Sequence, residues 1–91
     1  MTIDETLDAL QQKKRSMSCS ELERLLRALG FVIRDGGRGG HKIFTRPGLA
    51  DFHCGSFDGK ANPIKFPYIV KVIRIITLYR EELEKLLEQG K

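Results

Sequence analysis

The segment from residue 35 to residue 40 constrains the fold of this chain most, because four of its six residues are glycine. Glycine is unfavourable inside helices and strands but adopts positive φ without steric cost, so such a cluster predicts a turn. Residues 31–34 on one side and 41–46 on the other contain β-branched and aromatic side chains. The three segments together therefore predict an antiparallel β-hairpin.

A helix with clear start and stop signals precedes the hairpin. Ser18 and Glu21 have the spacing of a capping box, and Gly30 supplies the left-handed residue at which helices commonly end. Between them, an apolar stripe with i, i+3, i+4, i+7 spacing is formed by Leu22, Leu25, Leu26 and Leu29. The sequence therefore predicts a helix over residues 18–29 that buries this stripe.

The remaining segments predict two more helices and a third strand. Residues 2–13 form a short helix, and residues 49–54 show a weak alternation that predicts a strand. The segment 55–63 contains Gly, Asp, Asn and Pro and is predicted to be a loop. Residues 68–78 are rich in Ile and Val, but from 67 to 88 the polar residues recur at three- and four-residue steps. This spacing predicts one helix of about 22 residues, or about 33 Å.

These elements predict an α+β fold with the order α-β-β-β-α, in which a three-stranded antiparallel sheet packs on two helices. A helical extension, residues 1–16, precedes the domain proper, residues 17–91. The extension carries an apolar helical stripe formed by Ile3, Leu7 and Leu10. The simplest use of this stripe is to pack against the domain. A homodimer contact through this stripe is the alternative.

The charge of the chain is unevenly distributed, although the formal net charge is only +4. Residues 11–46 carry nine bases and three acids, and residues 60–80 carry five bases and no acid, whereas both ends of the chain are acidic. Two basic segments of this kind suit a surface that follows the phosphates of a nucleic acid. An ordinary solvated surface of Lys and Arg is the alternative.

The apolar runs of the chain are a few residues long, far short of the roughly 20 residues that a transmembrane helix needs. The N-terminal residues are acidic and lack the basic and apolar regions of a signal peptide. Cys19 and Cys54 lie 35 positions apart and match no zinc-binding spacing. We therefore expect a cytoplasmic protein with reduced thiols, no membrane contact, no metal and no cofactor.

The order of the elements, with a glycine-rich turn that leads into a histidine, resembles the HicA family of toxin mRNA interferases, which share a fold like that of double-stranded-RNA-binding domains. The similarity extends over about residues 18–77. It is carried by short matching segments in the same order and spacing, namely Ser20-Glu21-Leu22, Leu25-Leu26, Gly30-Phe31, Gly39-Gly40-His41, Phe44, Pro47 and Ile64 to Val72.

The resemblance implies the toxin of a type II toxin–antitoxin system, an endoribonuclease that cleaves single-stranded mRNA without a metal. It also implies that His41 is required for cleavage and that a HicB-type antitoxin is the protein partner. The family's usual tripeptide is Gly-Ser-His or Gly-Thr-His, whereas this chain has Gly39-Gly40-His41. If that hydroxyl binds phosphate or orients the imidazole, its absence predicts weaker catalysis with RNA binding retained.

Histidine suits RNA cleavage because imidazole, with an unperturbed pKa of about 6.5, both takes and gives protons near neutrality. We therefore predict that His41 is the general base or acid. In the glycine turn, the backbone N–H groups of Gly39 and Gly40 could approach a phosphate closely. Four cations close to His41 in sequence could neutralise the charge that builds on phosphorus, namely Arg34, Arg38, Lys42 and Arg46. Of these, Arg38 or Lys42 would stabilise the transition state. The second basic segment offers contacts to the RNA backbone from Lys60, Lys65, Lys71 and Arg74.

Other functions fit the same residues. In a non-catalytic RNA-binding module, His41 would be an ordinary surface histidine and the glycines a flexible turn. In a protein-interaction adaptor, Ile43 and the exposed sheet, or the stripe of the N-terminal extension, would bind another chain. Phe57 and Tyr68 are aromatic residues that could stack on bases, whereas Phe52 and Phe66 are expected in the core.

Overall fold

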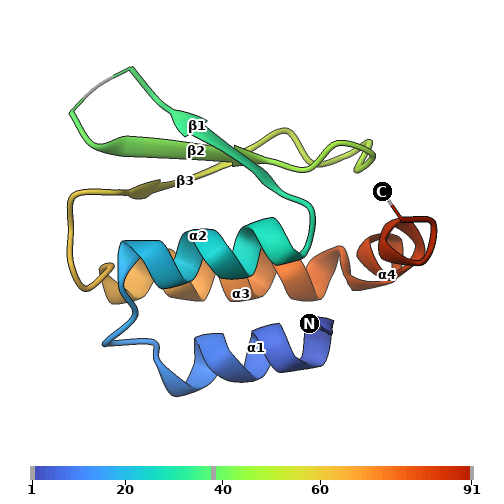
Figure 1. The fold of residues 1–91 in the computed structure, drawn as a ribbon, viewed down its shortest axis with the longest axis horizontal. Helices are drawn as coiled ribbons and strands as arrows, with labels where there is room; N and C mark the ends of the chain where they lie inside the picture. The colour runs from blue at the N-terminus through green and yellow to red at the C-terminus, as the bar shows by residue number, and fades with distance from the viewer. Residues whose placement is uncertain (1, 38, 91) are drawn as a thin grey trace.

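The structure, a computed structural model, describes residues 2–37 and 39–90. Within these residues the chain forms an α+β fold, as predicted, with the elements α1 (Ile3–Gln12), α2 (Cys19–Ala28), β1 (Val32–Asp35), β2 (His41–Thr45), β3 (Gly55–Asp58), α3 (Phe66–Leu78) and α4 (Arg80–Glu88). The strands form an antiparallel sheet in the order β1-β2-β3. Helices α2 and α3 cover one face of this sheet, and α1 lies beyond them (Figure 1). In the described part of the chain, every helix falls short of the length and apolar character that a membrane crossing requires.

Helix α2 begins and ends where the sequence predicts. The Ser18 hydroxyl accepts the N–H of Glu21 at 3.1 Å, and the Glu21 carboxylate accepts the N–H of Ser18 at 3.4 Å, which completes the capping box. Gly30 has a φ of +89°, the left-handed conformation expected after the last turn. The predicted apolar stripe faces the core. Each of its residues is at most 2% exposed, and they are Leu22, Leu25, Leu26 and Leu29.

The predicted hairpin is also present, since β1 and β2 pair in antiparallel register with Ile33 opposite Phe44. On the other side of β2, Phe44 lies opposite Gly55 of β3. Side chains alternate between the two faces of a sheet, and the face that carries the buried Phe44 packs on the helices. We call the opposite face the outer face; its residues are Val32, Arg34, His41, Ile43, Thr45, Ser56 and Asp58.

The third strand lies later in the chain than predicted, because residues 55–58 form β3 and residues 49–54 are irregular. Leu49 is buried and its N–H donates to the Arg46 carbonyl in a turn, which directs this segment away from the sheet. At the start of β3, the ring of the facing Phe44 occupies the space that a side chain on Gly55 would need. Two residues later, Phe57 is fully buried, so the prediction that it could stack on bases is wrong.

The single C-terminal helix predicted from the sequence is instead two helices, α3 and α4, which meet at Tyr79. The Thr77 hydroxyl donates to the Ile73 carbonyl at 2.8 Å, a contact that often bends helices. The Tyr79 ring packs edge-on against Phe52, with 5.6 Å between ring centroids, and its hydroxyl donates to the Asp51 carbonyl at 3.2 Å. These contacts with a distant loop hold Tyr79 at the junction, where α4 turns away from α3 (Figure 1).

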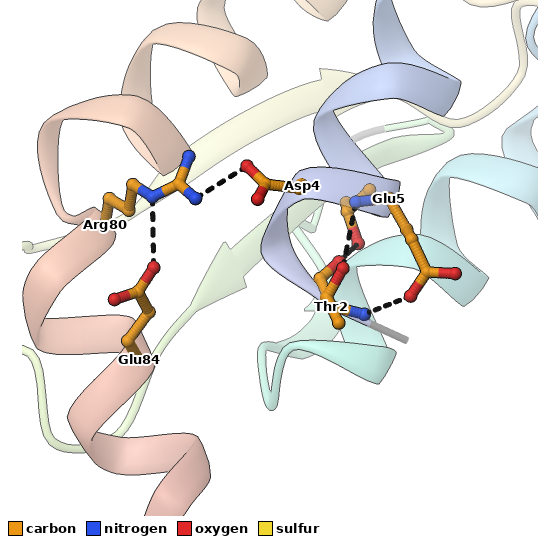
Figure 2. Close-up of polar contacts among 6 residues, drawn as sticks. Thr2, Asp4, Glu5, Arg80 and Glu84 are labelled. Carbon is orange, nitrogen blue, oxygen red and sulfur yellow. Dashed lines mark hydrogen bonds and ion pairs between the residues drawn. The ribbon is translucent and has the colours of Figure 1, made fainter.

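The N-terminal extension is part of the core. Ile3 and Leu10 of α1 are buried, and Leu7 packs against the same cluster. At the first turn of α1, the Asp4 carboxylate accepts a hydrogen bond from the Arg80 guanidinium of α4 at 2.6 Å (Figure 2). The apolar stripe therefore packs against the domain, which is the simplest use predicted for it.

Candidate functional site

His41 begins β2, and its half-buried side chain lies on the outer face of the sheet. It borders two open hollows, of about 500 and about 270 Å³. The residues that line the larger hollow are Gly36, Gly39, His41, Asp58 and Tyr68. Those that line the smaller one are Asp35, Gly37, Gly39, Gly40 and His41. The imidazole is therefore reachable from solvent, beside open space in which a phosphodiester could lie.

The imidazole of His41 packs directly against the backbone of Gly36. Its backbone N–H donates to the carbonyl of His41 at 2.8 Å, which makes the two residues neighbours across the hairpin. A Cβ atom on Gly36 would lie only 2.6 Å from Cδ2 of the imidazole. The ring therefore lies directly over the glycine backbone, and a side chain at position 36 would push it aside.

Asp58 is the residue directly opposite His41 on β3. Side chains of such pairs have their Cβ atoms about 5 Å apart, so the carboxylate and the imidazole share one end of the outer face. The Asp58 carboxylate also accepts the backbone N–H of Lys60 at 2.9 Å, which holds it in place. Tyr68, from the first turn of α3, lines the same hollow.

Sequence reasoning missed Asp58, because residues 55–63 were predicted to be a loop. The alternation Gly55, Ser56, Phe57, Asp58, with Phe57 directed to the core, is the signal that could have revealed it. A strand placed at these residues would have directed Asp58 to the face that carries His41.

Lys42 does not lie beside the imidazole, contrary to the prediction. Adjacent residues of a strand point to opposite faces, and the partner of Lys42 on β3 is the fully buried Phe57. The ammonium of Lys42 lies 2.8 Å from the Asp35 carboxylate. This hydrogen bond lowers the pKa of Asp35 and raises the pKa of Lys42. The charge of Lys42 is therefore compensated by Asp35 on the face opposite His41. The prediction that Lys42 contacts the transition state is wrong for this reason.

Arg46 is a buried structural residue and not a phosphate-binding one, since only 4% of it is exposed. Its Nε donates to the Leu29 carbonyl at 2.8 Å and its Nη1 to the Pro47 carbonyl at 2.5 Å. The guanidinium fills the space beside Gly30, where a Cβ would lie 2.6 Å from its Cζ. Arg46 thus binds the carbonyl at the C-terminal end of α2, and desolvation lowers its pKa.

Arg34 is the predicted cation that the structure does bring to the face of His41. It is exposed, precedes Gly36 by two residues and lies opposite Ile43 of β2. Residues two positions apart in a strand share a face, so Arg34 and His41 are diagonal neighbours on the outer face. The predicted Arg38 lies outside the described residues.

In the second basic segment, Lys60 lies against the glycine turn, whereas Lys65, Lys71 and Arg74 belong to α3 and the residue before it. Lys65 is exposed and precedes the first turn of α3 as its N-cap. Lys71 and Arg74 are exposed and line another open hollow, of about 290 Å³, together with Ser56 of β3. Lys71 connects the two regions, because its ammonium lies 5.9 Å from the ring centroid of Tyr68, within the range of cation–π attraction.

Gly40 has a structural reason to lack a side chain. Its φ is +74°, and the stem of Lys60 lies where a Cβ would project. A serine or threonine at this position would clash with the lysine and strain the backbone. The hydroxyl expected from the resemblance is therefore replaced by a glycine whose free space Lys60 fills.

The sequence and the structure were compared with known families, curated proteins and solved structures. No family model, no curated protein and no solved structure matches the chain. Within residues 2–37 and 39–90, His, Cys, Asp and Glu side chains form no group of three or more that could hold a metal ion.

Proposed function

We propose that this protein is an endoribonuclease of the mRNA interferase type, which cleaves single-stranded RNA without a metal and uses His41 as its general base or acid. The observation that carries this proposal is the placement of the imidazole. It is half-buried over Gly36, borders two open hollows and has a carboxylate directly opposite. Histidines with a reachable ring and a facing carboxylate are suited to proton transfer.

The reaction would be an internal displacement at phosphorus. His41 removes the proton of the 2′-hydroxyl, the 2′-oxygen bonds to phosphorus, and the bond from phosphorus to the 5′-oxygen breaks. The departing 5′-oxygen takes up a proton from a water molecule, and the resulting hydroxide recovers a proton from the His41 imidazolium, which leaves a 2′,3′-cyclic phosphate, a 5′-hydroxyl and neutral His41. The Asp58 carboxylate, on the facing strand, would stabilise the imidazolium that forms, and Arg34 offers positive charge on the same face.

The open site suggests control by a protein that covers it. The hollows beside His41 are open and the described residues contribute no lid over them. A HicB-type antitoxin with an acidic contact face would complement the positive charge of the chain. Induction of the wild-type protein should then arrest growth, whereas induction of His41→Ala should not.

A cleavage assay with a matched control tests the proposal. Labelled single-stranded RNA is incubated in EDTA with the wild-type protein, with His41→Ala and with His53→Ala, which alters the second histidine of the chain, exposed in an irregular segment. We expect fragments with cyclic phosphate ends from the wild type and from His53→Ala, and bound but uncut RNA with His41→Ala. Cleavage by His41→Ala at the wild-type rate would overturn the proposal.

A non-catalytic RNA-binding module is the second candidate. The observation that favours it is the loss of two predicted cations from the site, since Lys42 is paired with Asp35 and Arg46 is buried. Fewer charges then remain to stabilise a transition state. In the same assay, this function predicts salt-sensitive binding of RNA by every variant and fragments from none.

A further inference from the structure

Lys60 lies across the glycine turn that contains the candidate site. If Gly40 had a Cβ, it would lie 2.7 Å from Cδ of Lys60 and 3.0 Å from Cβ of Lys60, so the lysine stem runs along the glycine backbone. The ammonium lies 3.7 Å from the position that a Cβ on Gly39 would take. Because Gly39 lines both hollows beside His41, the stem carries a positive charge to their edge.

The backbone of Lys60 is held in a fixed relation to His41. Its N–H donates to the carboxylate of Asp58, and Asp58 is the residue opposite His41 in the sheet. The N–H of the intervening Gly59 donates to the carbonyl of Gly40 at 2.7 Å. The first hydrogen bond holds the turn after β3 in shape, and the second ties that turn to the residue that precedes β2, so the position from which the lysine side chain starts is fixed relative to the sheet.

The charge of Lys60 is available to a ligand. Among the ion pairs of the described residues, Lys13, Arg27, Lys42 and Arg80 contribute the cations, and Lys60 contributes none. Lys42, the lysine closest to His41 in sequence, is by contrast compensated by Asp35. An ammonium without an acidic partner beside an open hollow is suited to bind an anion.

We propose that Lys60 is the phosphate-binding residue of the His41 site, and that its ammonium binds the phosphodiester of single-stranded RNA that lies beside the imidazole. This inference rests on the proposed function, because it assigns Lys60 to the same substrate. Gly40 is then a positioning residue, because its missing side chain allows the lysine stem to reach across the turn.

The first test measures binding separately from cleavage. In a His41→Ala background, which keeps the RNA intact, affinity for a labelled single-stranded RNA is measured at several salt concentrations. We expect Lys60→Met, which keeps the stem and removes the charge, to reduce the slope of log affinity against log salt by about 0.7, the value for one phosphate contact on a single strand. The matched control Lys85→Met alters an exposed lysine of α4 and should leave the slope unchanged.

The second test uses the active protein. With His41 intact, Lys60→Met should cleave RNA about a hundredfold more slowly, the typical effect of removing one group that stabilises transition-state charge. In the His41→Ala background of the first test, Gly40→Ala should reduce the salt slope as Lys60→Met does, because it displaces the stem, and the variant that carries both changes should show no further reduction. Circular dichroism and thermal unfolding establish that each variant is folded before it is compared.

The outcomes separate this inference from the function on which it rests. If Lys60→Met retains both the wild-type slope and the wild-type cleavage rate while His41→Ala does not cleave, the assignment of Lys60 is overturned and the nuclease proposal stands. If His41→Ala cleaves like the wild type, the nuclease proposal fails, whereas a reduced slope in Lys60→Met still supports phosphate binding by Lys60. If the wild type shows no salt-dependent RNA affinity, both are overturned.

Discussion

The orientation of one ring depends on the absence of one methyl group. The His41 imidazole lies over Gly36, with Cδ2 only 2.6 Å from the position of a missing Cβ. Around it, Asp58 and Arg34 occupy the same face, whereas Lys42 points to the other. At the scale of single residues, the site therefore consists of the His41 ring, which the backbone of Gly36 positions, flanked by the Asp58 carboxylate and the Arg34 guanidinium on the neighbouring strands.

We predict that Gly36→Ala lowers the rate of RNA cleavage by about a hundredfold, because displacement of a reacting group by about 1 Å has an effect of that size. The cleavage rate and the imidazole NMR resonances of His41 provide the measurement. Gly37→Ala is the control for strain in the turn, since residue 37 has a φ of +82° but no atom within 4 Å of the added methyl group. Equal rates of RNA cleavage by Gly36→Ala and the wild type would contradict the statement that the backbone of Gly36 positions the His41 ring.

At the scale of elements, the two capped helices depend on carboxylates at their first turns. In α2, Glu21 accepts hydrogen bonds from Ser18 and contacts the Lys13 ammonium at 2.5 Å. The hydrogen bond with Lys13 and that with the backbone of Ser18 lower the pKa of Glu21 from its ordinary value of 4.5. In α1, hydrogen bonds from Thr2 lower the pKa of Glu5 in the same way (Figure 2).

A carboxylate whose pKa is lower in the folded state stabilises the fold above its unfolded pKa and loses this effect as the pH falls through the folded pKa. We therefore predict that the free energy of unfolding is constant above pH 4.5 with respect to these groups and decreases below it. Urea unfolding at several pH values measures this. Glu21→Gln should weaken the acid dependence, whereas Glu81→Gln, at an exposed position of α4, should leave it unchanged. An unchanged acid dependence in Glu21→Gln would exclude Glu21 as a source.

At the scale of the whole molecule, α1 closes the side of the core opposite the sheet, and α4 lies at one end of the molecule (Figure 1). Helix α1 lies beyond α2 and α3 (Figure 1), and Leu10 in its last turn is fully buried. Arg80 of α4 binds Asp4 of α1 and Glu84 of its own helix (Figure 2). These ion pairs are exposed, and such pairs contribute about 1 kcal/mol or less, so apolar burial supplies most of the attachment.

We predict that Leu10→Ala lowers the free energy of unfolding by about 3 kcal/mol, because it removes buried methyl groups and leaves a cavity between α1 and the rest of the core. Leu78→Ala is the matched control, since Leu78 is 72% exposed and should change stability by less than about 0.5 kcal/mol. Urea unfolding of both variants provides the comparison. Similar stability losses in the two would show that α1 is not part of the core.

The sequence alone determined the features that depend on residues a few positions apart. The capping box of Ser18 and Glu21, the stop at Gly30 and the glycine turn that leads into His41 are set by local hydrogen bonds and by permitted φ values. The fold class followed from the order of these elements. The sequence also indicated that the N-terminal stripe would be buried, because helical spacing collects its side chains on one side.

Only the tertiary structure decided which side chains meet at the site. The sheet register directs Lys42 away from His41 and brings Asp58 opposite it, and a one-residue shift in register would reverse both. Arg46 is buried because carbonyls at Leu29 and Pro47 accept its guanidinium. The contact of Arg46 with Leu29 and the pairing of His41 with Asp58 join residues 17 positions apart in the chain, so these partners are chosen by packing of the whole core and not by any local pattern.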